Sequence, residues 1–263
     1  MELTYLLRRD RWLTIGGLAL VVAITSAYVL RGVGMDMSAL DTTRMARDME
    51  MAQPEWTLGY AGLMFAMWWL MMTAMMLPSA TPVLLLVAAL NRRASPGRQP
   101  YGATALFAAG YLVAWAGFSV VAVAAQAWLT AHGILTSMLH VGGGALAGGM
   151  LLAAGLWQLT PLKRACLRHC RSPVHFLAAD RRRGAVGALV MGAEHGAYCV
   201  GCCWMMMALL FVGGIMNRYW IAGLAGCALA EKVFPGGERV AQIAGVILIA
   251  AGLALAASTT LGA

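Results

Sequence analysis

Long apolar runs separated by short polar segments make up most of this chain. About 20 helical residues are needed to cross the hydrocarbon core of a bilayer. Seven runs come close to that length: Trp12–Leu30, Leu58–Leu77, Tyr101–Thr130, His140–Leu159, Gly184–Val212, Ile215–Phe234 and Val240–Ala257. The pattern predicts an all-α fold, a polytopic transmembrane helical bundle of about seven spans, with residues 1–263 forming a single integral membrane domain. The run at 215–234 is the weakest of the seven because charged residues crowd both of its ends.

The composition agrees with a membrane protein and excludes a large soluble domain. Of the 263 residues, 61% are hydrophobic and 11% are charged, whereas soluble domains carry roughly 25% charged residues. The net charge of +8 raises the question of nucleic-acid binding. The basic residues, however, stand in short segments between the apolar runs, which is the topology signal of membrane proteins. We therefore expect contact with membrane lipid and no nucleic-acid partner.

Lysine and arginine are distributed unevenly over the predicted loops. They gather before the first run, in the segments 78–100 and 160–183, and after the sixth run, whereas the segment 131–139 and the C-terminal tail have none. Basic residues favour the cytoplasmic side of a membrane. The N-terminus is therefore predicted to be cytoplasmic and the C-terminus extracytoplasmic, in the cytoplasmic (inner) membrane. If the run at 215–234 does not span, the C-terminus lies on the other side.

A group of potential metal ligands stands inside the fifth apolar run. On a helix with 100° per residue, His195, Cys199, Cys202 and Cys203 share an arc of about 100°. Imidazole and thiolate together suit copper, zinc or iron, although cysteine also packs as a small hydrophobic residue. The neighbouring Glu194 and Tyr198 lie just off this arc, where they could orient a ligand or hold a proton. Alternatively, Glu194 pairs with a basic residue such as Lys232.

Methionines form a second candidate set. Met64, Met67, Met71 and Met75 share one stripe of the second apolar run. Thioether sulfur suits Cu(I), but methionine also fills irregular gaps in cores. The preceding loop, predicted to lie outside, holds five more methionines among acidic residues: Met35, Met37, Met45, Met49 and Met51. A tetrahedral or trigonal site on the fifth run would borrow a ligand from another helix, with Met71 or Met75 as the candidates.

Two further features lie at the predicted cytoplasmic side. Pro78 and Pro82 interrupt helical hydrogen bonding, so the second run either ends there or forms a broken helix of the kind that borders transporter binding sites. Cys166, His169 and Cys170 follow the fourth run among basic residues, which favour the thiolate form. Because the cytosol keeps thiols reduced, they predict a thiol or metal site rather than a structural disulfide.

Several blocks resemble a bacterial domain family of unknown function, catalogued as predicted metal-binding integral membrane proteins. The blocks are the Trp68–Pro78 segment with its Ala-Met-Met-Leu-Pro ending, Gly110–Trp115, Gln158–Pro173, and the His-Gly-x-Tyr-Cys-x-Gly-Cys-Cys-Trp string at 195–204. Gly214–Asn217 and Glu231-Lys232 belong to the same resemblance, which covers roughly residues 60 to 257. It implies metal binding and carries no established reaction.

The first hypothesis is a membrane-embedded soft-metal binding protein that handles or transports the ion across the inner membrane. The ion is expected to be Cu(I), with zinc or iron as alternatives, and a metallochaperone or a membrane complex as a possible partner. The chain lacks a phosphate-binding loop, a nucleophile elbow and a dinucleotide fingerprint, so hydrolysis of ATP by this chain is not expected. Two alternatives remain: a membrane thiol or metal redox enzyme, and an accessory subunit of a larger complex.

Overall fold

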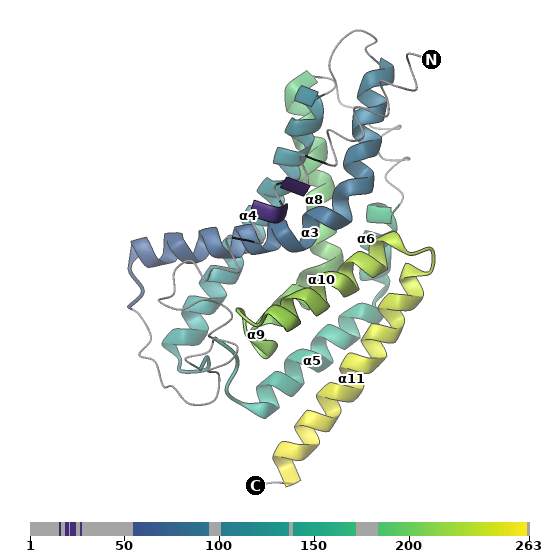
Figure 1. The fold of residues 1–263 in the computed structure, drawn as a ribbon. Helices are drawn as coiled ribbons and strands as arrows, with labels where there is room; N and C mark the ends of the chain where they lie inside the picture. The colour runs from purple at the N-terminus through teal and green to yellow at the C-terminus, as the bar shows by residue number, and fades with distance from the viewer. Residues whose placement is uncertain are drawn as a thin grey trace.

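The computed structural model describes residues 55–94, 101–136, 139–171 and 184–261, with isolated helical positions between 16 and 27. The regular secondary structure of this part of the chain is helical apart from one isolated β-bridge, which confirms the all-α prediction. Figure 1 shows the arrangement of its helices. They are α3 (Leu58–Ala94), α4 (Tyr101–Ala131), α5 (Gly144–Leu159), α6 (Pro161–Arg171), α8 (Gly184–Ala208), α9 (Leu210–Gly213), α10 (Arg218–Val233) and α11 (Gly237–Leu261). Most of the predicted span at 12–30 and the loop methionines at 35–51 lie outside the described residues.

The number of membrane spans differs from the prediction. In the described part, four segments are long and apolar enough to cross a bilayer: α3, α4, α8 with α9, and α11. A fifth exists if α5 and α6 count as one span bent by 63°. The prediction of seven is therefore wrong: of the six predicted runs that lie in the described part, only four or five form such spans, because an apolar run need not be one long helix. Helices α5 and α10 have 16 residues each, or about 24 Å, which is short of the ~30 Å hydrocarbon core.

The two prolines of the second run lie inside helix α3 rather than at its end. The helix continues for 37 residues through Pro78 and Pro82, and Figure 1 shows that it changes direction part-way along its length. Proline removes a backbone donor and clashes with the preceding turn, so kinks are expected there. The prediction that the helix is broken or ends at these prolines is thus replaced by a bent, continuous helix.

Helices α4 and α8 cross at close range because glycines stand at their contact. A Cβ at Gly192 would collide with the backbone carbonyl of Phe107, and a Cβ at Gly110 with that of Leu189. Small residues allow helix backbones to approach closely in a membrane. This approach brings the side chain of Tyr111, the residue after Gly110, against the thiol-bearing face of α8.

Two local signals direct α6 and α10 toward the same region. Thr160 adopts an extended conformation before Pro161, as residues before proline do, and α6 leaves at an angle and packs against α8. Asn217 caps α10 by accepting the backbone N–H groups of Tyr219 and Trp220 at 3.2 and 3.3 Å. Figure 1 shows α10 between α3 and the α5–α11 pair. The sulfur-rich core lies where α3, α4, α6, α8 and α10 meet.

Candidate metal centre

Three thiols on α8 are buried, and two of them donate hydrogen bonds to the backbone of the third. Cys199, Cys202 and Cys203 are at most 2% exposed. The Sγ atoms of Cys202 and Cys203 both donate to the carbonyl oxygen of Cys199, at 3.1 and 2.9 Å. Side chains of adjacent helical residues diverge by 100°, yet these two thiols turn back toward the same acceptor. One turn of helix therefore gathers three sulfur atoms around one carbonyl.

Helix α6 adds a fourth thiol. Cys170 is buried in the same core and is close enough to Cys199 and Cys202 to act on their charges. Cys166, one turn earlier, is half-buried beside α8, where a Cβ on Gly201 would stand 3.2 Å from its Sγ. The sequence analysis predicted a separate thiol or metal site at the α6 cysteines. The structure brings Cys170 into the same cluster as the α8 thiols.

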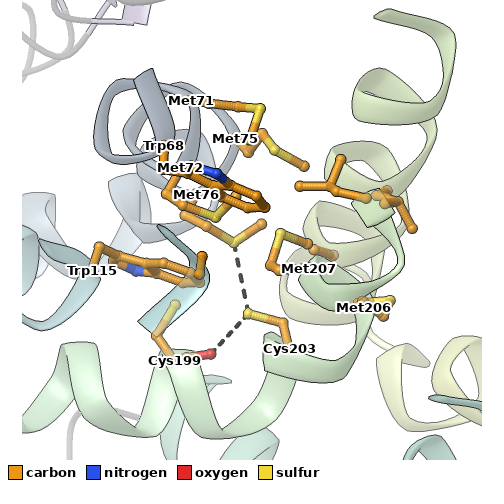
Figure 2. Packing of buried hydrophobic residues seen from close by; sticks show 14 of the residues in the cluster. Trp68, Met71, Met72, Met75, Met76, Trp115, Cys199, Cys203, Met206 and Met207 are labelled. Carbon is orange, nitrogen blue, oxygen red and sulfur yellow. Dashed lines mark hydrogen bonds between the residues drawn. The ribbon is translucent and has the colours of Figure 1, made fainter. Parts of the chain in front are cut away.

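Helix α3 contributes a thioether. The Sγ of Cys203 lies 3.8 Å from the Sδ of Met76, as the dashed line in Figure 2 marks. Figure 2 also shows Met207 beside this pair and Met71 and Met75 on the other side of the Trp68 ring. All of these side chains are buried. The α3 residue in contact with a thiol is thus Met76, on the helix face next to the Met71 and Met75 stripe.

A lysine and a tyrosine reach into the cluster from two other helices. The Nζ of Lys232 on α10 lies 2.9 Å from Cys199 Sγ, 3.3 Å from Ser79 Oγ and 3.8 Å from Met76 Sδ. The hydroxyl of Tyr111 on α4 lies 3.1 Å from Cys199 Sγ and 3.2 Å from the Met76 carbonyl oxygen, to which it donates. The sulfur of Cys199 is therefore in contact with both an ammonium group and a phenol hydroxyl. Neither residue was among the predicted site residues.

His195 is buried one turn before Cys199 but faces α4. Its ring lies 6.0 Å from the ring centroids of both Phe107 and Tyr111. It is 3% exposed, and its Nδ1 has no hydrogen-bond partner among the described residues. This imidazole borders the thiol cluster across the Tyr111 ring.

The remaining predicted residues form a separate group at the edge of α8. His169 stacks on the ring of Tyr198 with centroids 3.7 Å apart, and Glu194 is close enough to act on the His169 charge. Tyr198 is 42% exposed. His169 therefore pairs with Tyr198 and Glu194, whereas Cys170 of the same helix turns inward to the thiols.

A buried ion pair lies beside the cluster. Lys163 Nζ is 2.5 Å from Glu231 Oε2, with both side chains at most 1% exposed. Gln158 donates to Glu231 Oε1 at 2.7 Å and to Met206 Sδ at 3.3 Å, and accepts from Lys163. Adjacent residues of α10 thus point to different partners, Glu231 to α5 and α6 and Lys232 to the thiols.

In this structure the thiol sulfurs do not surround a common point as the ligands of a metal ion would. Within the described ranges, no three imidazole, thiol or carboxylate groups stand in the geometry of a metal site. Cys202 and Cys203 are instead turned to the Cys199 carbonyl. Ligation of one ion by these sulfurs requires rotation about the Cα–Cβ bonds, a change of side-chain rotamer that leaves the helix intact.

Sequence periodicity could identify the thiol face of α8 but not the residues that meet it. Met76 stands four residues after Met72 on the face of α3 next to the predicted stripe, and Tyr111 and Lys232 stand in blocks of the family resemblance. The one signal for Lys232 was a charged residue at the end of an apolar run. Its partner depends on how α10 packs, which periodicity does not contain.

Comparison with known proteins identifies the family. The family model for PpoB2, described as a copper chaperone, matches residues 65–255, which contain every residue of the cluster. No curated protein and no solved structure matches the chain. The predicted resemblance to metal-binding membrane proteins is confirmed in this form, and the metal that the family implies is copper. With its several candidate transmembrane helices, the chain belongs to the PpoB2 family of copper chaperones.

Proposed function

We propose that this protein binds Cu(I) within the membrane at a sulfur site formed by Cys170, Cys199, Cys202 and Cys203 of α6 and α8 together with Met76 of α3. The contact between Cys203 and Met76 carries the proposal, because it joins a thiol and a thioether from distant parts of the chain at 3.8 Å. Soft thiolate and thioether ligands select Cu(I).

The donor set favours copper over zinc and iron. Every side chain placed against Cys203 or Cys199 offers sulfur, a hydroxyl or an ammonium group, and the buried carboxylate of Glu231 is bonded to Lys163 instead. Structural zinc sites use four cysteine or histidine ligands in a tetrahedron, a set that the four thiols alone would also supply, so the thioether of Met76 is what distinguishes the two metals. A thioether beside thiols supports Cu(I) more than either alternative.

The methionines of α3 and α8 would carry the ion to or from this site. Figure 2 shows a column of buried sulfur atoms that passes the Trp68 ring from Met71 and Met75 and ends at Met207 and Cys203. Thioethers bind Cu(I) without being deprotonated, so they suit short-lived positions along a path. Cys166 and His169, at the half-buried end of α6, would exchange the ion with the outside of the bundle.

We further propose that the protein lies in the inner membrane with a cytoplasmic N-terminus and an extracytoplasmic C-terminus. This orientation requires α10 to return the chain to the cytoplasmic side, although its 16 residues are short of a full span. Helix α3 ends in Arg92 and Arg93, and α6 is rich in basic residues. Basic residues favour the cytoplasmic side, which supports placing these two segments there. Figure 1 shows the end of α4, the beginning of α5 and the C-terminus toward the same lower end of the molecule, which agrees with one uncharged side.

The test is a metal analysis of purified protein in detergent, loaded with Cu(I) without oxygen. We compare the unaltered chain, a variant with Cys199, Cys202 and Cys203 changed to Ser, and the control Cys227→Ser, whose thiol lies against Glu231 rather than the cluster. The proposal expects near-stoichiometric copper in the unaltered chain and the control, and its loss in the triple variant. Equal copper in all three, or none in any, contradicts it.

The same samples separate copper binding from dithiol chemistry. Free thiols are titrated before and after a mild oxidant, with and without Cu(I). A copper site protects its thiols only when it is loaded. Oxidant-dependent loss of thiols in pairs, with no bound copper in any sample, would favour the redox alternative instead.

A further inference from the structure

Lys232 is half-buried, and its ammonium group contacts a thiol sulfur rather than a carboxylate. Its nearest partner is Cys199 Sγ at 2.9 Å, followed by Ser79 Oγ at 3.3 Å and Met76 Sδ at 3.8 Å. Ionisable residues inside a membrane are costly, and they are placed where a partner or a function compensates the cost. The partner here is one of the proposed copper ligands.

The neighbouring carboxylate is committed elsewhere. Glu231 precedes Lys232 on α10, yet it bonds to Lys163 at 2.5 Å and accepts from Gln158 at 2.7 Å. This network holds the end of α10 against α5 and α6. It therefore fixes the direction in which Lys232 points and leaves the ammonium charge directed at Cys199.

We propose that Lys232 is the counter-charge of the copper site and makes the site selective for a monovalent ion. This inference rests on the proposed function. When two of the four thiols bind one Cu(I) ion as thiolates, the site has a single negative charge, which the ammonium cancels. A divalent ion bound by the same two thiolates leaves the ammonium charge uncompensated, and an unpaired charge in a buried site is strongly unfavourable. A divalent ion must recruit a third thiolate to reach neutrality.

The charge acts without ligating the metal, since an ammonium group offers donors and no acceptor. Lys232 is thus a positioning and specificity residue. Its removal should weaken Cu(I) binding by the loss of one charge-assisted hydrogen bond to sulfur, roughly ten- to a hundredfold. Zn²⁺ binding should stay equal or become tighter, because a repulsive charge is removed. The ratio of the two affinities is the diagnostic quantity.

The experiment measures Cu(I) affinity by competition with a chromophoric Cu(I) chelator, and Zn²⁺ affinity with a fluorescent zinc chelator, on full-length protein in detergent without oxygen. The test variants are Lys232→Gln and Lys232→Leu, and Lys232→Arg retains the charge. Arg168→Gln is the control for the loss of one positive charge, since the Arg168 side chain is exposed and faces Glu238 rather than sulfur. Gel filtration and circular dichroism identify variants that remain folded.

We expect the Cu(I)-to-Zn²⁺ affinity ratio to fall at least about tenfold in Lys232→Gln or Lys232→Leu, to return toward the original value in Lys232→Arg, and to stay unchanged in Arg168→Gln. If both neutral variants unfold, the Lys232→Arg ratio decides: retention supports a charge effect, and a tenfold loss overturns it. A ratio within twofold of the original in a folded neutral variant overturns the inference while copper binding itself stands. An unaltered chain that binds no copper overturns the proposed function and this inference together.

Discussion

The sulfur atoms of Met76 and Cys203 lie 3.8 Å apart although 127 positions separate the two residues in the chain. Their contact joins the bend region of α3 to the thiol turn of α8. Two prolines follow Met76 within the next six positions. The bend that they introduce helps to set the position of the Met76 thioether. The contact between α3 and α8 therefore depends on the shape of α3.

Met76→Leu should weaken Cu(I) binding at least about tenfold, the scale seen when even an outer partner of a metal ligand is lost. Leucine has a similar volume and little effect on packing, so the fold should persist. The measurement is a chelator competition, with Met216→Leu as a control because Met216 is buried outside α3 and α8. Equal losses in both variants would indicate a packing effect rather than loss of a ligand.

Tyr111→Phe removes the hydroxyl that lies between Cys199 Sγ and the Met76 carbonyl. We expect the free energy of unfolding to fall by about 1 kcal/mol, the typical net value of one hydrogen bond. Thermal unfolding in detergent followed by circular dichroism measures it. Tyr219→Phe, on a side chain that is 76% exposed, should change nothing, and an unchanged midpoint in both variants would argue against the Tyr111 bond.

Glu231→Gln leaves Lys163 as an unpaired buried charge. Breaking one side of such a pair costs about 3–5 kcal/mol, so the free energy of unfolding should drop by that amount. The double variant Glu231→Gln with Lys163→Met removes both charges and should recover most of the loss. A thermal double-mutant cycle tests this prediction, and a double variant no more stable than Glu231→Gln would contradict it.

Gly192→Leu places a side chain where the Phe107 carbonyl already lies. Overpacking of this kind costs about 1–3 kcal/mol, and separation of α4 from α8 should also weaken Cu(I) binding by moving Tyr111 away from Cys199. Gly117→Ala is the control on α4, since a Cβ there meets nothing within 4 Å. Thermal midpoints and copper content, measured on the same samples, check both effects.

The sequence predicted individual helices better than their number or their contacts. The run at 101–130 became α4 within one residue at its end, because an uninterrupted apolar segment has few alternatives in a membrane. The count of seven failed where runs bend or fall short, as at Thr160-Pro161 and in α10. Hydropathy measures the length of an apolar segment and says little about its direction.

The same limit applies to the candidate site. Helical periodicity identified Cys199, Cys202 and Cys203 as one face, since that face is a local property of α8. The neighbours of the face are set by other means, such as the glycines between α4 and α8 and the ion pair that orients α10. Lys232 and Tyr111 therefore emerged only from the structure, and Cys170 moved from a separate site into this one.

The shared acceptor at Cys199 has a kinetic meaning. The Sγ atoms of Cys202 and Cys203 both donate to one backbone oxygen, at 3.1 and 2.9 Å, as side-chain bonds added to the helical bond that this carbonyl accepts. Either thiol can therefore leave while the other stays, and the backbone of α8 keeps its bonds throughout. At the proposed copper site, an incoming ion would then meet ligands that are released one at a time, so ligand substitution would proceed stepwise on a rigid scaffold without opening of the helix bundle.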